Sequence, residues 1–266
     1  MPIRDYREAV AVVTGAANGL GAALARGLAE RGARVALVDL DPSVITAAGQ
    51  LGGARGYVVD VSDRVAVEGL AKTVAADFGG LNLLINNAGV ALAGALEAVD
   101  HDDMHWLMNV NFWGVVHGCR AFLPLLRAGS QAQLVNVVSA FAWLGMPGKS
   151  AYGASKAAVR ALSEALRVEL HGTGVGVTLL VPGPLDTGIV QRGRTTSEAQ
   201  REAEARFVAR RAIALDRVVV RTLRGISRDQ ARVVVGSDAW MLDLAARFAP
   251  SLTLAVLARI ARRLPF

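Results

Sequence analysis

The sequence predicts one doubly wound α/β domain spanning residues 1–266, in which helices cover both faces of a parallel seven-stranded sheet. Short runs rich in β-branched residues alternate with alanine- and leucine-rich stretches of helical spacing. The short runs are apolar throughout, which is typical of strands buried on both faces. With 266 residues, 53% of them hydrophobic, and no linker-like or repeated segment, the chain can bury a single large core.

The predicted strands recur along the whole chain and alternate with the helical stretches. They occupy 9–15, 33–40, 55–62, 81–89, 132–140, 175–183 and 231–236. The helix predicted around 104–127 is apolar nearly all round, which is more than contact with one sheet explains, so we expect a homodimer or homotetramer that buries it. The longest break in the pattern, 184–215, is polar and arginine-rich, and we expect it to form a lid over the substrate.

Composition narrows the classes of protein and partner. The single cysteine, Cys119, excludes an intrachain disulfide framework and suits a reducing compartment. No signal-peptide pattern and no membrane-spanning apolar run is present, so a cytoplasmic location is predicted. The positive excess lies in 191–266, where 15 arginines stand against 7 acids. This segment lacks a recognition motif and interleaved aromatics, so a solvated face is favoured and nucleic acid is not an expected partner.

A glycine-rich turn follows the first predicted strand. In TGAANGLG, the predicted cofactor-binding residues are Gly15, Asn18, Gly19, Leu20 and Gly21. The spacing departs from the common G-x-G-x-x-G pattern, and glycine turns also occur for packing reasons. Glycines between a strand and a helix nevertheless let the backbone approach a pyrophosphate, which the helix N-terminus then attracts.

Acidic residues at the ends of the next two strands extend this prediction. Asp39 could accept hydrogen bonds from the adenosine ribose and would repel the extra phosphate of NADP, which favours NAD. Alternatively, Asp39 caps a helix, a role that Asp41 or Ser43 could equally fill. Asp60, followed by Val61, could contact the adenine edge or cap a helix beginning near Ser62.

Five short motifs occur in order on the expected elements. They are TGAANGLG (14–21), NNAG (86–89), a serine at 139, YGASK (152–156) and PGPLDT (182–187). Together they resemble the classical short-chain dehydrogenase/reductase family over about residues 8 to 236. The resemblance implies a Rossmann-type sheet, a nicotinamide cofactor, and a Ser–Tyr–Lys catalytic set assisted by an asparagine.

The resemblance also implies a role for each matching residue. Tyr152 becomes the acid/base, Lys156 its partner, Ser139 the group that holds the substrate oxygen, and Asn111 the support of a proton-relay water. Besides Tyr152 and Lys156, the residues implied to border the cofactor are Asn87, Ala88, Gly89, Pro182, Gly183, Leu185 and Thr187.

The chemistry explains why a lysine stands four residues after the tyrosine. A free phenol has a pKa of roughly 10, too high for a base near neutral pH. A nearby ammonium and the positive nicotinamide ring both favour the phenolate. Residues at i and i+4 of a helix share one face, and lysine brings a compact charge where arginine would need a bidentate partner. His101 and His105 share that spacing too, but no third ligand is evident, so no metal is expected.

The predicted function is NAD-dependent interconversion of a hydrophobic secondary alcohol and its ketone, because the segment FAWLGMPG (141–148) gives the site an apolar wall. One alternative is a 3-oxoacyl thioester reductase, against which Asp39 counts because NADPH use is common there. Another is a non-catalytic dinucleotide sensor, which would need no complete Ser–Tyr–Lys set.

Residues 237–266 are predicted to form an amphipathic helical extension. Its apolar positions are Leu254, Leu257, Ile260, Ala261 and Leu264, and its arginines are Arg259, Arg262 and Arg263. Such a helix could lie on an anionic membrane surface or pack on protein. Packing on protein is favoured, because most amphipathic helices in soluble enzymes complete a core or an interface.

Overall fold

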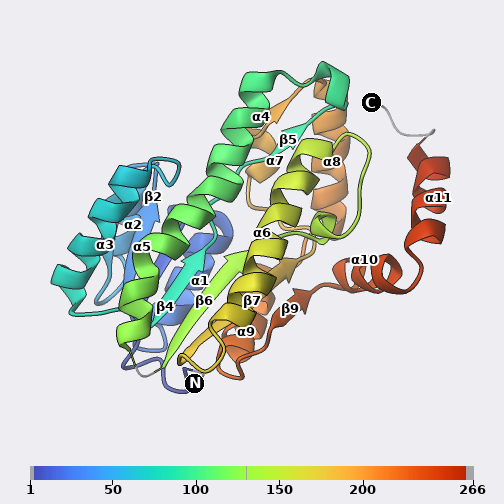
Figure 1. The fold of residues 1–266 in the computed structure, drawn as a ribbon. Helices are drawn as coiled ribbons and strands as arrows, with labels where there is room; N and C mark the ends of the chain where they lie inside the picture. The colour runs from blue at the N-terminus through green and yellow to red at the C-terminus, as the bar shows by residue number, and fades with distance from the viewer. Residues whose placement is uncertain (1–2, 130, 262–266) are drawn as a thin grey trace.

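A parallel sheet of seven strands forms the centre of the molecule, as predicted (Figure 1). The computed structural model describes residues 3–129 and 131–261. The sheet order is β3-β2-β1-β4-β6-β7-β9, a Rossmann-type arrangement that reverses direction beside β1. The strands are β1 (Val10–Thr14), β2 (Arg34–Asp39), β3 (Arg55–Val58), β4 (Leu83–Asn86), β6 (Ala132–Val137), β7 (Val175–Pro182) and β9 (Arg232–Val235).

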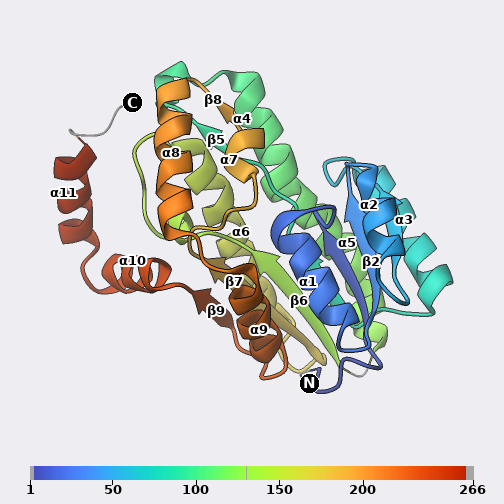
Figure 2. The ribbon, with the colours of Figure 1, turned by 180° about the vertical axis from the view of Figure 1, so that it is seen from behind.

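Eleven α-helices are assigned within the described residues, and most of them cover the sheet. They are α1 (Gly19–Ala29), α2 (Ser43–Gly49), α3 (Arg64–Phe78), α4 (His101–Met108), α5 (Gly114–Ala128), α6 (Ser150–Glu169), α7 (Ile189–Arg192), α8 (Glu198–Arg211), α9 (Leu215–Ile226), α10 (Ser237–Phe248) and α11 (Pro250–Ala261). Helices α1, α2 and α9 pack on one face, and α3, α5 and α6 on the other (Figures 1 and 2).

Successive side chains of each strand point to opposite faces of the sheet, so each strand contributes residues to the hydrophobic cores on both faces. In β1, Val13 points into the core under α1, α2 and α9, whereas its neighbour Val12 points into the core under α3, α5 and α6. Both are fully buried, which is why the strand sequence is apolar at every position. Cys119 of α5 is buried in the second core, and burial raises the pKa of its thiol to about 12. It is a packing residue and not a nucleophile.

The helix predicted around 104–127 is in fact interrupted. Helix α4 ends at Met108, a π-helical turn spans Asn109–Trp113, and α5 then continues. A one-turn π-bulge inserts a residue without breaking the helix, so the apolar pattern alone could not reveal it. Trp113 in this turn is about half exposed.

The segment 184–215 contains regular structure that its polar sequence concealed. Helices α7 and α8 lie within it, and between them strand β8 (Arg194–Thr195) pairs in parallel with β5 (Leu92–Ala93). Helix α8 carries a single buried side chain, Gln200, so its sequence lacks the apolar periodicity that predicts a helix.

The predicted C-terminal extension consists of two helices, α10 and α11, which project from the body (Figure 2). Leu254 of α11 is more than half exposed, whereas Leu257 lines the cavity described below. Arg262, Arg263 and Leu264 lie outside the described residues. In the described part of the chain, none of the helices has the length and apolarity needed to cross a bilayer.

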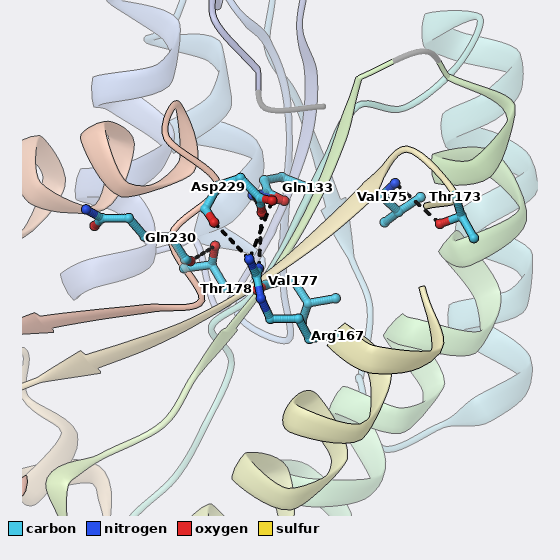
Figure 3. Close-up of polar contacts among 8 residues, drawn as sticks. All are labelled: Gln133, Arg167, Thr173, Val175, Val177, Thr178, Asp229 and Gln230. Carbon is cyan, nitrogen blue, oxygen red and sulfur yellow. Dashed lines mark hydrogen bonds and ion pairs between the residues drawn. The ribbon is translucent and has the colours of Figure 1, made fainter. Parts of the chain in front are cut away.

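The end of α6 remote from the cavity is tied to the sheet by a polar cluster (Figure 3). Arg167 donates to the Val177 carbonyl oxygen at 2.6 Å, to Oδ1 of Asp229 at 3.1 Å and to the Asp229 carbonyl oxygen at 3.0 Å. The side-chain amide of Gln133 donates to the same Asp229 oxygen at 2.9 Å. The cluster therefore joins α6, β6, β7 and the turn before β9.

Candidate active site

A cavity of about 1270 Å³ lies at the carboxyl ends of the strands, the edge at which doubly wound sheets bind ligands. It extends from the glycine turn after β1 to helices α8, α10 and α11. All of the predicted site residues except Asn111 and Gly21 line it. The structure thus brings together side chains separated by up to 172 positions, from Gly15 to Thr187.

The glycine turn has the geometry that a phosphate requires. Gly15 has φ of 65°, a left-handed conformation that side chains disfavour. A Cβ on Gly21 would collide with the carbonyl oxygen of Gly15, so this residue serves the packing of α1 on the turn. Because α1 starts at Gly19, its free N–H groups and positive dipole end face the cavity.

Asp39 is anchored with acceptor capacity to spare. Its Oδ2 accepts from the Ala17 amide at 2.9 Å, and its Oδ1 accepts from the Asp41 amide at 3.0 Å. It does not cap α2, whose N-cap position is Pro42. Asp41, just before that position, accepts from the Ser43 amide at 2.9 Å, which lowers the pKa of Asp41. A carboxylate has about four acceptor sites, so each Asp39 oxygen retains one for a ligand.

Asp60 also proves not to be a helix cap. Its Oδ1 accepts from the amide and the hydroxyl of Ser62, at 2.8 and 2.7 Å. Helix α3 begins two residues later than expected, at Arg64, and Asp63 caps it by accepting from two backbone amides.

Asn87 holds the end of β4 against the glycine turn. Its side-chain amide donates to the carbonyl oxygens of Thr14 and Gly15, at 2.9 and 3.1 Å. The Thr14 hydroxyl in turn accepts from the amides of Asn87 and Ala88, each at 3.0 Å. These bonds fix the floor of the cavity on which a cofactor would rest.

Ser139, Tyr152 and Lys156 all line the cavity. Ser139 follows β6 and its Oγ accepts from the Phe141 amide at 3.3 Å. Lys156 is only 4% exposed, its Nζ donates to the Val137 carbonyl oxygen at 3.2 Å, and it lies 5.9 Å from the centre of the Tyr152 ring. The i, i+4 spacing on α6 therefore places both side chains in one cleft, as predicted.

Burial perturbs both titratable groups, in opposite directions. It raises the pKa of Tyr152 to about 12, with Glu204 adding to the rise and the hydroxyl of Ser139 opposing it. It lowers the pKa of Lys156 to about 8, because a buried ammonium loses its hydration. In the chain alone, burial thus dominates the pKa of the phenol, and the lowering expected from the ammonium and the nicotinamide charge stays a prediction.

Asn111 lies in the π-helical turn behind the cavity wall and is completely buried. Its Oδ1 accepts from the Val90 amide at 2.8 Å, and its Nδ2 donates to the Val90 carbonyl oxygen at 3.0 Å and to Ser155 Oγ at 3.1 Å. Ser155 Oγ donates to the Tyr152 carbonyl oxygen at 2.8 Å. The side chain thus ties α6 to the strand-end segment beside it.

Sequence reasoning missed the charged residues that the segment 184–215 brings to the cavity. Arg192 of α7 donates to Asn18 Oδ1 at 2.6 Å and to the Thr187 carbonyl oxygen at 2.7 Å, beside the glycine turn. Glu204 of α8 pairs with Lys149 at 2.5 Å. The scarcity of lysine was the one sequence signal that marked Lys149, since the chain has only three. No group of three potential metal ligands occurs in residues 3–129 or 131–261.

This fold and this cavity define a dinucleotide-dependent oxidoreductase of the Rossmann type. A model of the short chain dehydrogenase family matches residues 9–198. The SadH protein of Mycobacterium tuberculosis is 37% identical over 252 residues, which cover 91% of each chain. The 1-deoxy-11-beta-hydroxypentalenate dehydrogenase of Streptomyces avermitilis is 39% identical over 215 residues, covering 75% of this chain and 80% of the relative.

Solved structures agree with these relatives. A short-chain dehydrogenase/reductase from Burkholderia phymatum in complex with NAD matches with a TM-score of 0.82 and 31% identity, covering 87% of this chain and 90% of the other. The chain belongs to the short-chain dehydrogenase/reductase family. It is an oxidoreductase that acts on alcohol and ketone groups, so the alternative of a non-catalytic sensor is not supported.

Proposed function

We propose that this enzyme interconverts a hydrophobic secondary alcohol and its ketone with NAD, and that Tyr152 is the acid/base. The observation that carries the proposal is the meeting of Ser139, Tyr152 and Lys156 in one cavity with the glycine turn. In that cavity a substrate oxygen and a nicotinamide ring have room to lie side by side.

The residues present fit a dinucleotide. The glycine turn and the N-terminus of α1 would hold the pyrophosphate, and the spare acceptor sites of Asp39 would hold the adenosine ribose. Lys156 has three N–H donors and gives one to Val137, so two remain for the hydroxyls of the nicotinamide ribose. When bound, the nicotinamide supplies hydride exchange and, in its oxidised form, a positive charge.

The protein side of the reaction is proton transfer and orientation. In the oxidative direction Tyr152 accepts the proton of the substrate hydroxyl, and in the reductive direction it returns one. Ser139 donates its hydroxyl hydrogen to the substrate oxygen, which orients the carbinol carbon. The positive charge of Lys156 favours the phenolate, and its burial among carbonyls and apolar groups strengthens that field.

The lining of the cavity supports an apolar substrate. Phe141, Met146, Pro147, Leu242 and Leu257 line the part between Tyr152 and the C-terminal helices. The Streptomyces relative is named as a dehydrogenase of a hydroxylated compound, which agrees with an alcohol as substrate. A 3-oxoacyl thioester reductase is the second candidate; the arginines of the last quarter favour it, and Asp39 opposes the NADPH that such enzymes commonly use.

Tyr152→Phe tests the reaction. Removing proton transfer costs roughly 100- to 10,000-fold in turnover, and the variant should still bind NAD because the ring and its packing remain. The measurements are NADH formation with a panel of hydrophobic secondary alcohols and NAD binding by fluorescence. Turnover within a few-fold of the parent would refute the assignment of Tyr152.

Asp39→Ala tests the choice of cofactor. The parent should use NAD more efficiently than NADP, and the variant should narrow that preference by removing a hydrogen-bond acceptor and a repulsive charge. Steady-state kinetics with both cofactors give the ratio. A parent that prefers NADP would contradict the proposal and would indicate that Arg192, at the same edge of the cavity, binds the extra phosphate.

We also propose a cytoplasmic homodimer or homotetramer, in which the half-exposed Trp113 and the apolar side chains of α11 contact another subunit or complete the cavity. Leu257 in the cavity wall supports packing on protein over contact with a membrane surface. A chain ending at Pro250 should then lose stability or substrate affinity, and the full chain should not sediment with anionic vesicles. Sedimentation with vesicles, together with an active truncated chain, would overturn this.

A further inference from the structure

Helix α8 covers the substrate half of the cavity without an apolar face of its own. Gln200 is its one buried side chain among the described residues, and Phe207 is about half exposed. Hydrophobic packing therefore contributes little to holding the helix in place. Three ion pairs fasten the segment to the body instead: Arg194–Asp103 at 2.6 Å, Lys149–Glu204 at 2.5 Å and Arg211–Asp238 at 3.1 Å.

The Lys149–Glu204 pair differs from the other two in burial and in position. Its side chains are 11% and 23% exposed, whereas Arg194 and Arg211 are about half exposed, so salt screens this pair least. Lys149 stands directly before α6, three residues before Tyr152. Both members of the pair line the same cavity as Tyr152.

We propose that Lys149 and Glu204 are positioning residues. Their ion pair fastens α8 over the substrate, and it keeps the carboxylate of Glu204 beside Tyr152 with its charge paired. This inference rests on the proposed role of Tyr152 as acid/base. Lys149 and Glu204 belong to none of the five sequence motifs, yet together they hold the lid closed and set the pH range in which Tyr152 acts as the base.

The electrostatic part follows from the charges around the phenol. Glu204 acts on Tyr152 in the direction that raises its pKa, and Lys149 offsets that charge by pairing with it. The other titratable groups lining the cavity near Tyr152 are Lys156 on α6, Asp102 and His105 on α4, and Asp238 on α10. A second set lies toward the glycine turn, namely Asp39, Asp41, Asp60 and Arg192.

The first experiment compares Glu204→Gln with Glu202→Gln. Glu202 lies on the same helix, pairs with Arg206 and is 69% exposed, so its variant makes the same chemical change facing solvent. Glu204→Gln removes a negative charge and leaves Lys149 unpaired, and both effects favour the phenolate. The rise of alcohol oxidation with pH should move down by about one unit, and KM should rise roughly tenfold. Glu202→Gln should match the parent in both.

The second experiment separates fastening from charge by exchanging the pair, Lys149→Glu with Glu204→Lys. The ion pair forms again, so KM should return toward the parent value. The charge on α8 is now positive, so the pH profile should stay displaced downward. The single variant Lys149→Met should move it upward, because Glu204 is then unpaired.

The outcomes decide between the two proposals. If Tyr152→Phe is inactive and Glu204→Gln behaves like Glu202→Gln, this inference is wrong and the proposed function stands. If Tyr152→Phe is active, the proposed function fails first. Should Glu204→Gln not fold, Glu204→Asp is the deciding variant, because it keeps the negative charge but shortens the side chain. A pH profile like the parent's together with a raised KM supports the inference. A displaced pH profile or an unchanged KM overturns it.

Discussion

Two basic residues of α6, eleven positions and about 16 Å apart along the helix, have opposite surroundings. Arg167 is one-third exposed and donates to four acceptor atoms, namely the carbonyl oxygens of Val177 and Asp229 and both carboxylate oxygens of Asp229 (Figure 3). Lys156 is almost completely buried, makes one hydrogen bond of 3.2 Å to a carbonyl oxygen, and has no ion pair among the residues that the structure describes. The less solvated cation is thus the less well paired.

The contrast separates stability from function within one helix. A paired charge at the protein surface holds elements together at little cost. A buried ammonium with one partner lowers the free energy of unfolding, and proteins keep such groups where a ligand completes them. Hydroxyl groups of a cofactor would accept the remaining hydrogen bonds of the Lys156 ammonium, whereas Arg167 already has its acceptors within the protein.

Of the changes that test this comparison, Lys156→Met should have the largest effect, a loss of turnover. In the proposed mechanism Lys156 supplies the charge that favours the phenolate and two donors to the cofactor ribose, so turnover of the variant should fall roughly 100- to 10,000-fold. Arg167→Met, the matched change at the other end of α6, should keep its kcat within about twofold. Assays at saturating NAD measure both, and similar losses in the two variants would contradict the division.

The pH dependence of stability should distinguish the two residues next. A folded-state pKa of about 8 for Lys156, below the ordinary 10.5, means that the unfolded chain binds more protons between these values. Lys156 should therefore contribute a rise in stability of about 2 kcal/mol from pH 8 to 10. Two groups with raised pKa values act in the opposite direction, Cys119 above about pH 9 and Tyr152 above about pH 10. Both are present in Lys156→Met as well, so urea unfolding at several pH values should show the rise as a growing difference in stability between the parent and this variant.

Arg167→Met should have the smallest effect, confined to stability. Losing the bonds to Val177 and Asp229 should lower the free energy of unfolding by roughly 1 to 2 kcal/mol, since the group is partly exposed. Arg224→Met, at an exposed position of α9, serves as control and should change stability by less than about 0.5 kcal/mol. Equal losses in the two variants would show that the cluster is not specific.

The parts of the molecule that repeat a local pattern could be predicted, and those that depend on distant partners could not. All seven strands of the sheet could be predicted from apolar runs such as 9–15 and 33–40, because a strand buried on both faces is apolar at nearly every position. Helix α8 has no such mark, since charges and not apolar contacts hold it. The pairing of Lys149 with Glu204 spans 55 positions, and nothing in either residue's neighbourhood indicates the other.

The site shows the same division. The glycine turn and the Tyr152–Lys156 spacing are local, so the sequence could place them. The capping of α3 by Asp63, and not by Asp60, depends on where the helix starts to within two or three residues, which the spacing of acidic residues does not resolve. The rise in the pKa of Tyr152 depends on burial by segments from across the chain, which the local spacing of Tyr152 and Lys156 does not indicate.

The packing of α1 against α9 has a consequence for synthesis. Helix α1 emerges from the ribosome early, but Val219 and Leu223, which cover it, are made about 190 residues later. The Tyr6 hydroxyl likewise donates to the Leu223 carbonyl oxygen at 2.7 Å, across 217 positions. At roughly 5 to 20 residues per second, a nascent chain therefore exposes the apolar side of its first helix for about ten seconds or more. During that interval the exposed apolar surface favours aggregation or chaperone binding, and the turn at the start of α1 has its final packing only on a nearly finished chain.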